Sequence, residues 1–251
     1  MNELAKQKFT YLGKGCQSYV FLSQDGLYVL KFIKHQRFAT KPWLNAVSFL
    51  PYFSSYQNER LLSKKQKLIQ LLTGWQVAFN YLPEETGVKW LHLNEKTGPS
   101  YPITIVDKIG LSSRIDLMDY QYLIQNKVEM LDTYLLRLFE RNEIEEANSM
   151  MDKLLQMILD IYKKGFADTD HALMQNTGVA NNMPLPVDIG QIAKDEEAKK
   201  TEVYNHALFN KTYRLRQWLE EHSPETKNYL EYRLNELIGP ELLTMQPHKD
   251  V

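Results

Sequence analysis

The stretch Gly165-Phe166-Ala167-Asp168-Thr169-Asp170-His171-Ala172-Leu173-Met174-Gln175-Asn176, with Val187-Asp188-Ile189-Gly190 after it, is the most informative part of this chain. Two aspartates, an asparagine and a third aspartate before a glycine follow a segment with strong helical periodicity. Carboxylate and amide oxygens in this order can hold a divalent metal and orient a hydroxyl nucleophile. The same residue types are also common in solvated turns. The interpretation therefore depends on what the rest of the chain carries.

The composition limits the classes of function. A chain of 251 residues is long enough for one large domain or two lobes. Lys and Arg total 30 against 31 Asp and Glu, so the net charge of −1 provides no field for nucleic acid, and no nucleic-acid partner is expected. Cys16 is the only cysteine, which excludes an intrachain disulfide and a Cys-based zinc site. A reducing, cytoplasmic environment is expected.

Neither a secretion signal nor a membrane span is expected. Residues Met1–Lys8 contain no apolar segment of the kind found in Sec-type signals. The most apolar run, Trp43–Phe53, has 11 residues and contains Pro51, so it is too short to cross a bilayer. Core or inter-lobe packing is favoured for this run over contact with a membrane or a partner.

The first part of the chain has the pattern of a small antiparallel sheet with one helix. Strand-forming residues flank Asp25-Gly26, a strong signal for a two-residue hairpin turn. A long helix is predicted next from Ser54 to Phe79, because its leucines and aromatic residues recur close to every 3.6 positions. Further strands are predicted at Val88–Leu93 and Ile103–Val106, with a turn at Glu95–Pro99 between them. Asp107–Gly110 then has the pattern of a crossover to the next lobe.

The remainder is predicted to be helical from Asp116 onward. The clearest helix spans Glu143–Lys164, with acids at its start and lysines followed by Gly165 at its end. Another helix is predicted to begin at Ser223-Pro224-Glu225. The fold class is therefore α+β, with a sheet lobe over residues 1–110 and a helical lobe over residues 111–251. Ligands commonly bind between lobes.

Two features near the N-terminus bear on chemistry. In Leu12-Gly13-Lys14-Gly15-Cys16-Gln17-Ser18-Tyr19-Val20, the glycines would allow the backbone to approach phosphate oxygens closely, although a plain hairpin explains them equally well. Lys31 follows in an otherwise apolar strand, where an ammonium needs a partner or a route to solvent. A lysine aimed at phosphates and paired with a carboxylate would explain both features together, whereas an edge-strand lysine is the simpler alternative.

The order of these elements resembles the protein-kinase-like superfamily, whose parts are a glycine-rich loop, a strand lysine with a helix glutamate, and a catalytic loop with a metal-binding aspartate. The resemblance covers roughly residues 8–192. It implies a two-lobed kinase-like fold with a shortened C-terminal lobe. The residues that carry it are Gly13, Gly15 and Ser18 in the loop, Lys31, Glu59, Asp170, Asn176 and the Asp188-Ile189-Gly190 triplet.

Several departures from the family pattern accompany the matches. Six positions separate Asp170 from Asn176 where the family has five, so the loop has an extra residue or Asp168 shares the catalytic role. His171 is interpreted as a neighbour rather than as the base. Asn181 and Asn182 are alternative metal-side amides, although a solvated turn is favoured for both. No Ala-Pro-Glu follows Asp188, and the remaining residues are too few for a full peptide-binding lobe.

The resemblance implies an ATP-dependent phosphotransferase that acts on a hydroxyl of a protein or a small molecule. Lys31, held by Glu59, would neutralise phosphate charge, and Asn176 and Asp188 would hold Mg²⁺. Asp170 or Asp168 would accept or orient the acceptor hydroxyl, and residues 105–110, including Asp107, would contact the adenine. One alternative is an inactive pseudokinase that binds a nucleotide or a protein partner. The other is an α+β adaptor without a nucleotide site.

Overall fold

The computed structural model describes residues 4–39, 51–93 and 99–243. The chain divides into two compact units. Unit 1 comprises Met1–Phe79 and Val88–Lys127, and unit 2 comprises Asn80–Gly87 and Val128–Val251. Most of the apolar run at residues 43–53 and of the predicted turn at residues 95–99 lies outside the described residues.

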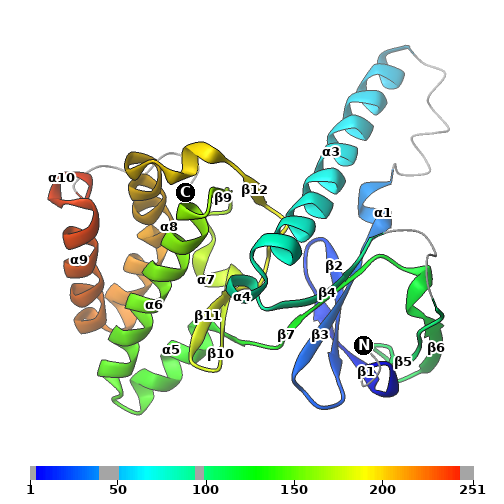
Figure 1. Cartoon of the computed structure of the whole chain (residues 1–251), viewed down its shortest axis with the longest axis horizontal. Coiled ribbons are helices and arrows are strands. Elements are labelled where there is room, and N and C mark those ends of the chain that lie inside the picture. Colours follow the sequence, from blue (N-terminus) through cyan, green and yellow to red (C-terminus); the bar gives the residue numbers. More distant parts are fainter. Residues whose placement is uncertain (1–3, 40–50, 94–98, 244–251) are drawn as a thin grey trace. The chain divides into compact units, whose positions relative to one another are not determined.

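Unit 1 is built on a seven-stranded sheet with the order β4-β7-β3-β2-β1-β5-β6 (Figure 1). Its pairs are antiparallel except for β1 and β5, which run parallel, so the sheet is mixed rather than wholly antiparallel. The strands are β1 (Lys8–Lys14), β2 (Ser18–Ser23), β3 (Tyr28–Ile33), β4 (Val88–His92), β5 (Pro102–Val106), β6 (Ser112–Asp116) and β7 (Tyr122–Asn126). The short helical segments are η1 (Leu4–Lys6), α1 (His35–Phe38) and η2 (Leu117–Asp119).

One face of this sheet carries an aromatic core. Period-two alternation brings Leu30 and Phe32 of β3 to the same face as Tyr122 and Ile124 of β7, and all four are buried. Phe21 packs edge-on against Phe32, with 5.8 Å between ring centroids. Lys31, which lies between Leu30 and Phe32, therefore belongs to the opposite face.

The long predicted helix is α3 (Pro51–Tyr81), whose last two residues belong to unit 2. Its C-terminal half is buried at Leu71, Trp75 and Ala78. Leu62 and Ile69 are exposed, so the leucine periodicity of the sequence corresponds to a buried face only towards the end of the helix.

Unit 2 is mostly helical and contains two small sheets. Its helices are α4 (Pro83–Thr86), α5 (Leu131–Glu140), α6 (Ile144–Lys163), α7 (Leu173–Asn176), η3 (Glu196–Lys199), α8 (Thr201–His222), α9 (Pro224–Ile238) and α10 (Pro240–Leu243). Strands β8 (Glu129–Met130), β10 (Thr177–Ala180) and β11 (Met183–Pro186) form one sheet, and β9 (Phe166–Asp168) pairs with β12 (Ile192–Lys194) in the other.

Helix α6 forms the centre of unit 2. It contacts α5, α8 and α9, and for this reason its second half is buried on most sides. Acids lie in its first turn and Lys163 in its last, and Gly165 follows with a φ of +83°, as the sequence pattern indicated. Ser223 caps α9 by accepting a hydrogen bond from the Thr226 amide at 3.3 Å. Both helix predictions are confirmed.

The α+β class and the presence of a sheet-rich and a helix-rich part are confirmed. Two finer expectations are wrong. Asp107–Gly110 is the turn of the antiparallel β5–β6 hairpin rather than a crossover. The chain first enters unit 2 for Asn80–Gly87, and its final passage from unit 1 to unit 2 follows Lys127. The chain is also not helical from Asp116 onward, because β7 inserts between β3 and β4 of the sheet and short strands interrupt unit 2. Among the described residues, no helix is both long and apolar enough to span a membrane.

Candidate functional site

The glycine-rich segment connects β1 and β2 in unit 1. The Gly15 amide donates to the Ser18 carbonyl at 3.0 Å, which closes a tight hairpin end. A Cβ atom at Gly13 would meet nothing within 4 Å, and one at Gly15 would make ordinary contacts. The fold itself therefore does not require glycine at either position, and the open space above the backbone is available to a ligand.

A second lysine, Lys34, supports this hairpin end, and the sequence analysis did not identify it. Its ammonium donates to the Gly15 carbonyl and lies 4.8 Å from the centre of the Tyr19 ring, and its amide donates to the Gln17 carbonyl at 2.9 Å. Burial, followed by the nearby Lys14 charge, lowers the pKa of Lys34. Its place directly after the strand of Lys31 is the only signal that the sequence carries for it.

Lys31 is buried in the middle of β3, with 7% of its surface exposed. Its Nζ donates to Oε1 of Gln125 on the adjacent strand β7 at 2.7 Å, and Gln125 is itself buried. Lys31 stands opposite Leu123, so the contact with Gln125 is diagonal across the two strands. Gln125 was not identified from the sequence, although a glutamine that follows Tyr122–Ile124 is a detectable polar interruption of an apolar strand.

The other residues predicted in unit 1 lie at the surface. Glu59, the predicted partner of Lys31, is exposed on α3. Asp107 is also exposed, and its Oδ1 accepts hydrogen bonds from the amides of Ile109 and Leu111, both at 2.9 Å. The carboxylate of Asp107 therefore shapes the β5–β6 turn. Contact of Asp107 with a nucleotide stays a prediction. The crossover between lobes that was expected at this residue is instead a hairpin turn.

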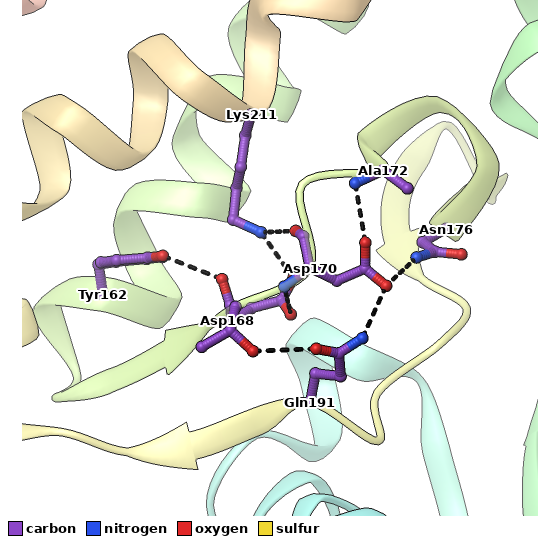
Figure 2. Close-up of polar contacts among 8 residues, drawn as sticks. Tyr162, Asp168, Asp170, Ala172, Asn176, Gln191 and Lys211 are labelled. Carbon is purple, nitrogen blue, oxygen red and sulfur yellow. Dashed lines mark hydrogen bonds and ion pairs between the residues drawn. The ribbon is translucent and has the colours of Figure 1, made fainter. Parts of the chain in front are cut away.

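In unit 2, the loop after β9 brings the predicted acidic residues together (Figure 2). The Asp170 carboxylate accepts hydrogen bonds from the Ala172 amide at 2.8 Å, Asn176 Nδ2 at 2.7 Å and Gln191 Nε2 at 3.1 Å. The three donors are neutral, and no ion pair among the described residues involves the Asp170 carboxylate, so hydrogen bonds stabilise its charge. Since Asn176 donates through its nitrogen, its side-chain oxygen is left as a possible metal ligand.

The extra residue between Asp170 and Asn176 is accommodated by the single helical turn α7. This turn shortens the path between them, and the two side chains meet despite the longer spacing. Asn181 and Asn182 both have positive φ values, 51° and 58°, and form the two-residue turn between β10 and β11. They are exposed turn residues, as favoured from the sequence.

The segment with Asp188 is tied to the same loop. The Val187 amide donates to the Asn176 carbonyl at 2.6 Å. Asp188 is therefore the next residue along the chain from the one that contacts Asn176. Asp188 is half-buried, and its Oδ1 accepts from the Gly190 amide at 3.3 Å. An amide and a carboxylate are ligands suited to Mg²⁺, whose remaining ligands in nucleotide sites are water and phosphate oxygens. Among the described residues, no group of three or more His, Cys, Asp or Glu side chains has metal-binding geometry.

Asp168 has a different environment from Asp170. Its Oδ2 forms an ion pair with Lys211 of α8 at 2.8 Å, and its Oδ1 accepts from the Asp170 amide at 3.0 Å (Figure 2). Lys211 was missed by the sequence analysis. It is buried on the same side of α8 as Ala207, Leu215 and Leu219, at spacings of four, so a lysine in an apolar helical stripe was the signal.

His171 lies beside this network. Its pKa is lowered, first by burial and then by the positive charge of Lys211. Its Nδ1 atom is buried, and among the described residues it has no hydrogen-bond partner. The protonated form of His171 is therefore disfavoured, and its role as a neighbour of the base stays a prediction.

Two cavities of unit 2 adjoin the loop. A small one of about 20 Å³, enough for one water molecule, is bordered by Asp168, Asp170, Asn176 and Lys211. An open pocket of about 250 Å³ lies where the loop meets α5 and α8. Its lining residues are Asp132, Ala172, Leu173, Met174, Gln175, Arg214 and Trp218.

No protein-family model matches the chain, and no curated protein matches it. Solved structures do match it. A 2.2 Å crystal structure of WbdD is 15% identical in sequence, with a TM-score of 0.44. The match covers 92% of this chain and 46% of the WbdD chain. A structure described as the bifunctional kinase-methyltransferase WbdD is 13% identical with a TM-score of 0.41 (92% and 45% covered). WbdD with the kinase inhibitor LY294002 is 14% identical with a TM-score of 0.40 (90% and 46% covered). The chain thus spans about half the length of these proteins.

Proposed function

We propose that this chain is an ATP-dependent phosphotransferase of atypical kinase type, which transfers the γ-phosphoryl group to a hydroxyl acceptor. The observation that carries the proposal is the convergence, within unit 2, of Asp170, Asn176 and the Asp188 segment through direct hydrogen bonds. A carboxylate with neutral donors beside two metal-type ligands suits a reaction that depends on positioning and charge stabilisation.

In this proposal the residues of unit 2 perform the proton chemistry. The acceptor hydroxyl approaches Asp170, its oxygen forms a bond to the γ-phosphorus, the bond to the bridging oxygen breaks, and ADP leaves. The proton of the hydroxyl passes to the Asp170 carboxylate. Asn176 and Gln191 fix the rotamer of that carboxylate by their hydrogen bonds. When bound through Asn176 and Asp188, Mg²⁺ would supply positive charge to the phosphate oxygens.

The residues of unit 1 would bind the nucleotide. The β1–β2 hairpin end has room for phosphate oxygens at Gly13 and Gly15, and Lys31 would contribute a cation from the adjacent strand. Glu59 stays the predicted partner of Lys31. Ser18 stays a predicted member of the phosphate-binding loop, in which its carbonyl closes the turn.

An acceptor could bind in the open pocket of unit 2. Its wall includes Ala172, whose amide donates a hydrogen bond to the Asp170 carboxylate. A molecule in the pocket would therefore lie close to the proposed base. Arg214 and Trp218 contribute a guanidinium and an indole to the same wall. The volume of this pocket, about 250 Å³, suits a small acceptor or a single side chain of a larger one.

The experiment is a thermal shift with ATP, with and without Mg²⁺, on the wild type and on Asp188→Asn. A ligand at 100 times its Kd stabilises a protein by about 2.7 kcal/mol, or roughly 5–10 °C for a chain of this size. We expect a Mg²⁺-dependent shift that Asp188→Asn loses. Asp160→Asn, an α6 variant outside the loop, is the matched control and should keep it.

Turnover separates the remaining possibilities. Release of ADP in the presence of a broad hydroxyl-acceptor panel is expected for an active enzyme. A shift without ADP release would favour the pseudokinase alternative, in which the same residues only bind the nucleotide. The absence of a thermal shift at millimolar ATP would contradict both the active enzyme and the pseudokinase. The adaptor without a nucleotide site would then be the remaining hypothesis.

A further inference from the structure

Lys211 makes contacts that reach beyond a single ion pair. The side chain comes from the middle of α8 and is 3% exposed. Its ammonium donates to Asp168 Oδ2 and also to the backbone carbonyl of Asp170 (Figure 2). One cation therefore contacts the side chain of one aspartate and the main chain of the other.

The loop between these aspartates has few other supports. The ladder between β9 and β12 ends at Asp168, which pairs with Ile192. Beyond it, Asp168 and Asp170 accept hydrogen bonds from main-chain amides two residues ahead, and these bonds are local to the loop. From outside the loop, the Tyr162 hydroxyl of α6 donates to the Asp168 carbonyl at 3.1 Å, and Asn176 and Gln191 contact the Asp170 carboxylate. Lys211 reaches the Asp170 carbonyl from a packed helix.

These contacts divide the two aspartates into different roles. Both carboxylate oxygens of Asp168 are engaged, one by Lys211 and one by the Asp170 amide. In the part of the chain that the structure describes, the Asp170 carboxylate receives only neutral donors, so it can accept a proton without the loss of an ion pair. These contacts favour Asp170 over Asp168 as the proton acceptor, a choice that the sequence left open.

We infer that Lys211 is a positioning residue of this site: it holds the Asp170 backbone and engages Asp168, so that Asp170 is the aspartate presented to the acceptor. The reference to an acceptor rests on the proposed function. The effect on the loop does not, and it can be measured in the free protein.

The test compares Lys211→Met with the double variant Lys211→Met/Asp168→Asn. The single variant leaves the Asp168 charge without its cation, and it should lower the Tm by roughly 10 °C. The double variant removes both charges and should recover most of that loss. It does not restore the bond to the Asp170 carbonyl, so the loop should stay loose.

Amide hydrogen exchange and steady-state kinetics report on the loop. In the double variant, exchange at residues 169–172 should be about tenfold faster than in the wild type. ADP release should be roughly 100-fold slower, with the KM for ATP nearly unchanged, because the base is displaced while nucleotide binding is retained. Lys211→Arg keeps the cation and should recover part of the protection. Lys227→Met, which removes a lysine paired with Glu220 on α8, is the matched control and should change neither reading.

The inference would be overturned if the stable double variant had the same amide exchange rates and the same kinetic constants as the wild type. Lys211 would then contribute only a structural ion pair. Failure of the proposed function has a different signature. In that case the wild type shows no Mg²⁺-dependent ATP shift, and the exchange measurement alone decides whether Lys211 orders the loop.

Discussion

The two units each bury a lysine, and the two lysines hold different kinds of structure. Lys31 of unit 1 contacts Gln125 across two strands that backbone hydrogen bonds already join along their length. Lys211 of unit 2 contacts a loop that lies beyond the end of a strand pair. Lys31 therefore lies between strands that are already ordered, whereas Lys211, by our inference, orders the loop that it contacts. Loss of Lys31 should therefore affect ligand binding, and loss of Lys211 should affect the loop itself.

The largest effect is expected from the loop aspartates. Asp170→Asn should lower phosphoryl transfer about 1,000-fold with little change in Tm, because the proton acceptor is lost and the protein ion pairs remain. Asp168→Asn should instead destabilise the protein by about 3 kcal/mol, because it leaves the buried Lys211 unpaired. Parallel measurement of ADP release and thermal unfolding distinguishes them. The reverse pattern would assign the base to Asp168.

A smaller effect is expected from Lys31→Met. The Kd for Mg·ATP should rise by roughly 10- to 100-fold, because a cation near phosphates contributes about 1.5–3 kcal/mol through charged hydrogen bonds. The unfolding free energy should fall by only about 1–3 kcal/mol, because the buried hydrogen bond between Lys31 and Gln125 is lost while the strands stay paired. Isothermal titration calorimetry and urea unfolding measure the two quantities. Lys8→Met, an exposed position on β1, serves as control.

The pH dependence of stability should contain a contribution from His171. Burial, with the charges of Lys211 and Arg214, keeps its folded pKa below 6.5, while Asp168 and Asp170 oppose this shift. The unfolded chain then binds more protons as the pH falls below 6.5, so stability should decrease in that direction. Urea unfolding between pH 7 and pH 5 should show a shallower loss for His171→Asn. An identical slope in the two proteins would contradict the assignment.

The smallest effect concerns the open pocket. Arg214→Ala should raise the KM for an acceptor by about tenfold while the KM for ATP is retained, because the guanidinium lines the pocket and no described carboxylate lies within ion-pair distance of it. Acceptor titrations at saturating ATP measure this ratio. An unchanged acceptor KM would remove the pocket from the proposed site.

The sequence predicted features with local signals. The hairpin at Asp25-Gly26, the α6 periodicity and the Ser223 cap depend on neighbouring residues, and each appears in the structure. The hairpin turn, however, spans residues 24–27 and not the two residues predicted. Lys31 was found because every residue next to it in β3 is apolar. Lys211 was missed because the residues between the members of its helical stripe are a mixture of apolar, polar and basic types, so the stripe does not stand out in the sequence.

Features set by distant pairing could not be predicted. Asp107–Gly110 has the polar composition of either a crossover or a turn, and only the pairing of β5 with β6 makes it a turn. The Tyr122–Ile124 run is equally apolar in a buried helix and in a central strand, and its position between β3 and β4 decides the outcome. The contact between Asp170 and Asn176 likewise depended on how α7 accommodates the extra residue.

The parallel pairing of β1 with β5 has a consequence for synthesis of the chain. Lys8 of β1 lies beside Thr104, so the outer edge of β1 has no partner strand until residues 102–106 have been made. Fragments that end before Pro102 would expose the backbone amides and carbonyls of that edge to other chains. Truncation between residues 92 and 102 should therefore yield an aggregating fragment, whereas a chain that continues through β7 contains every strand of the sheet.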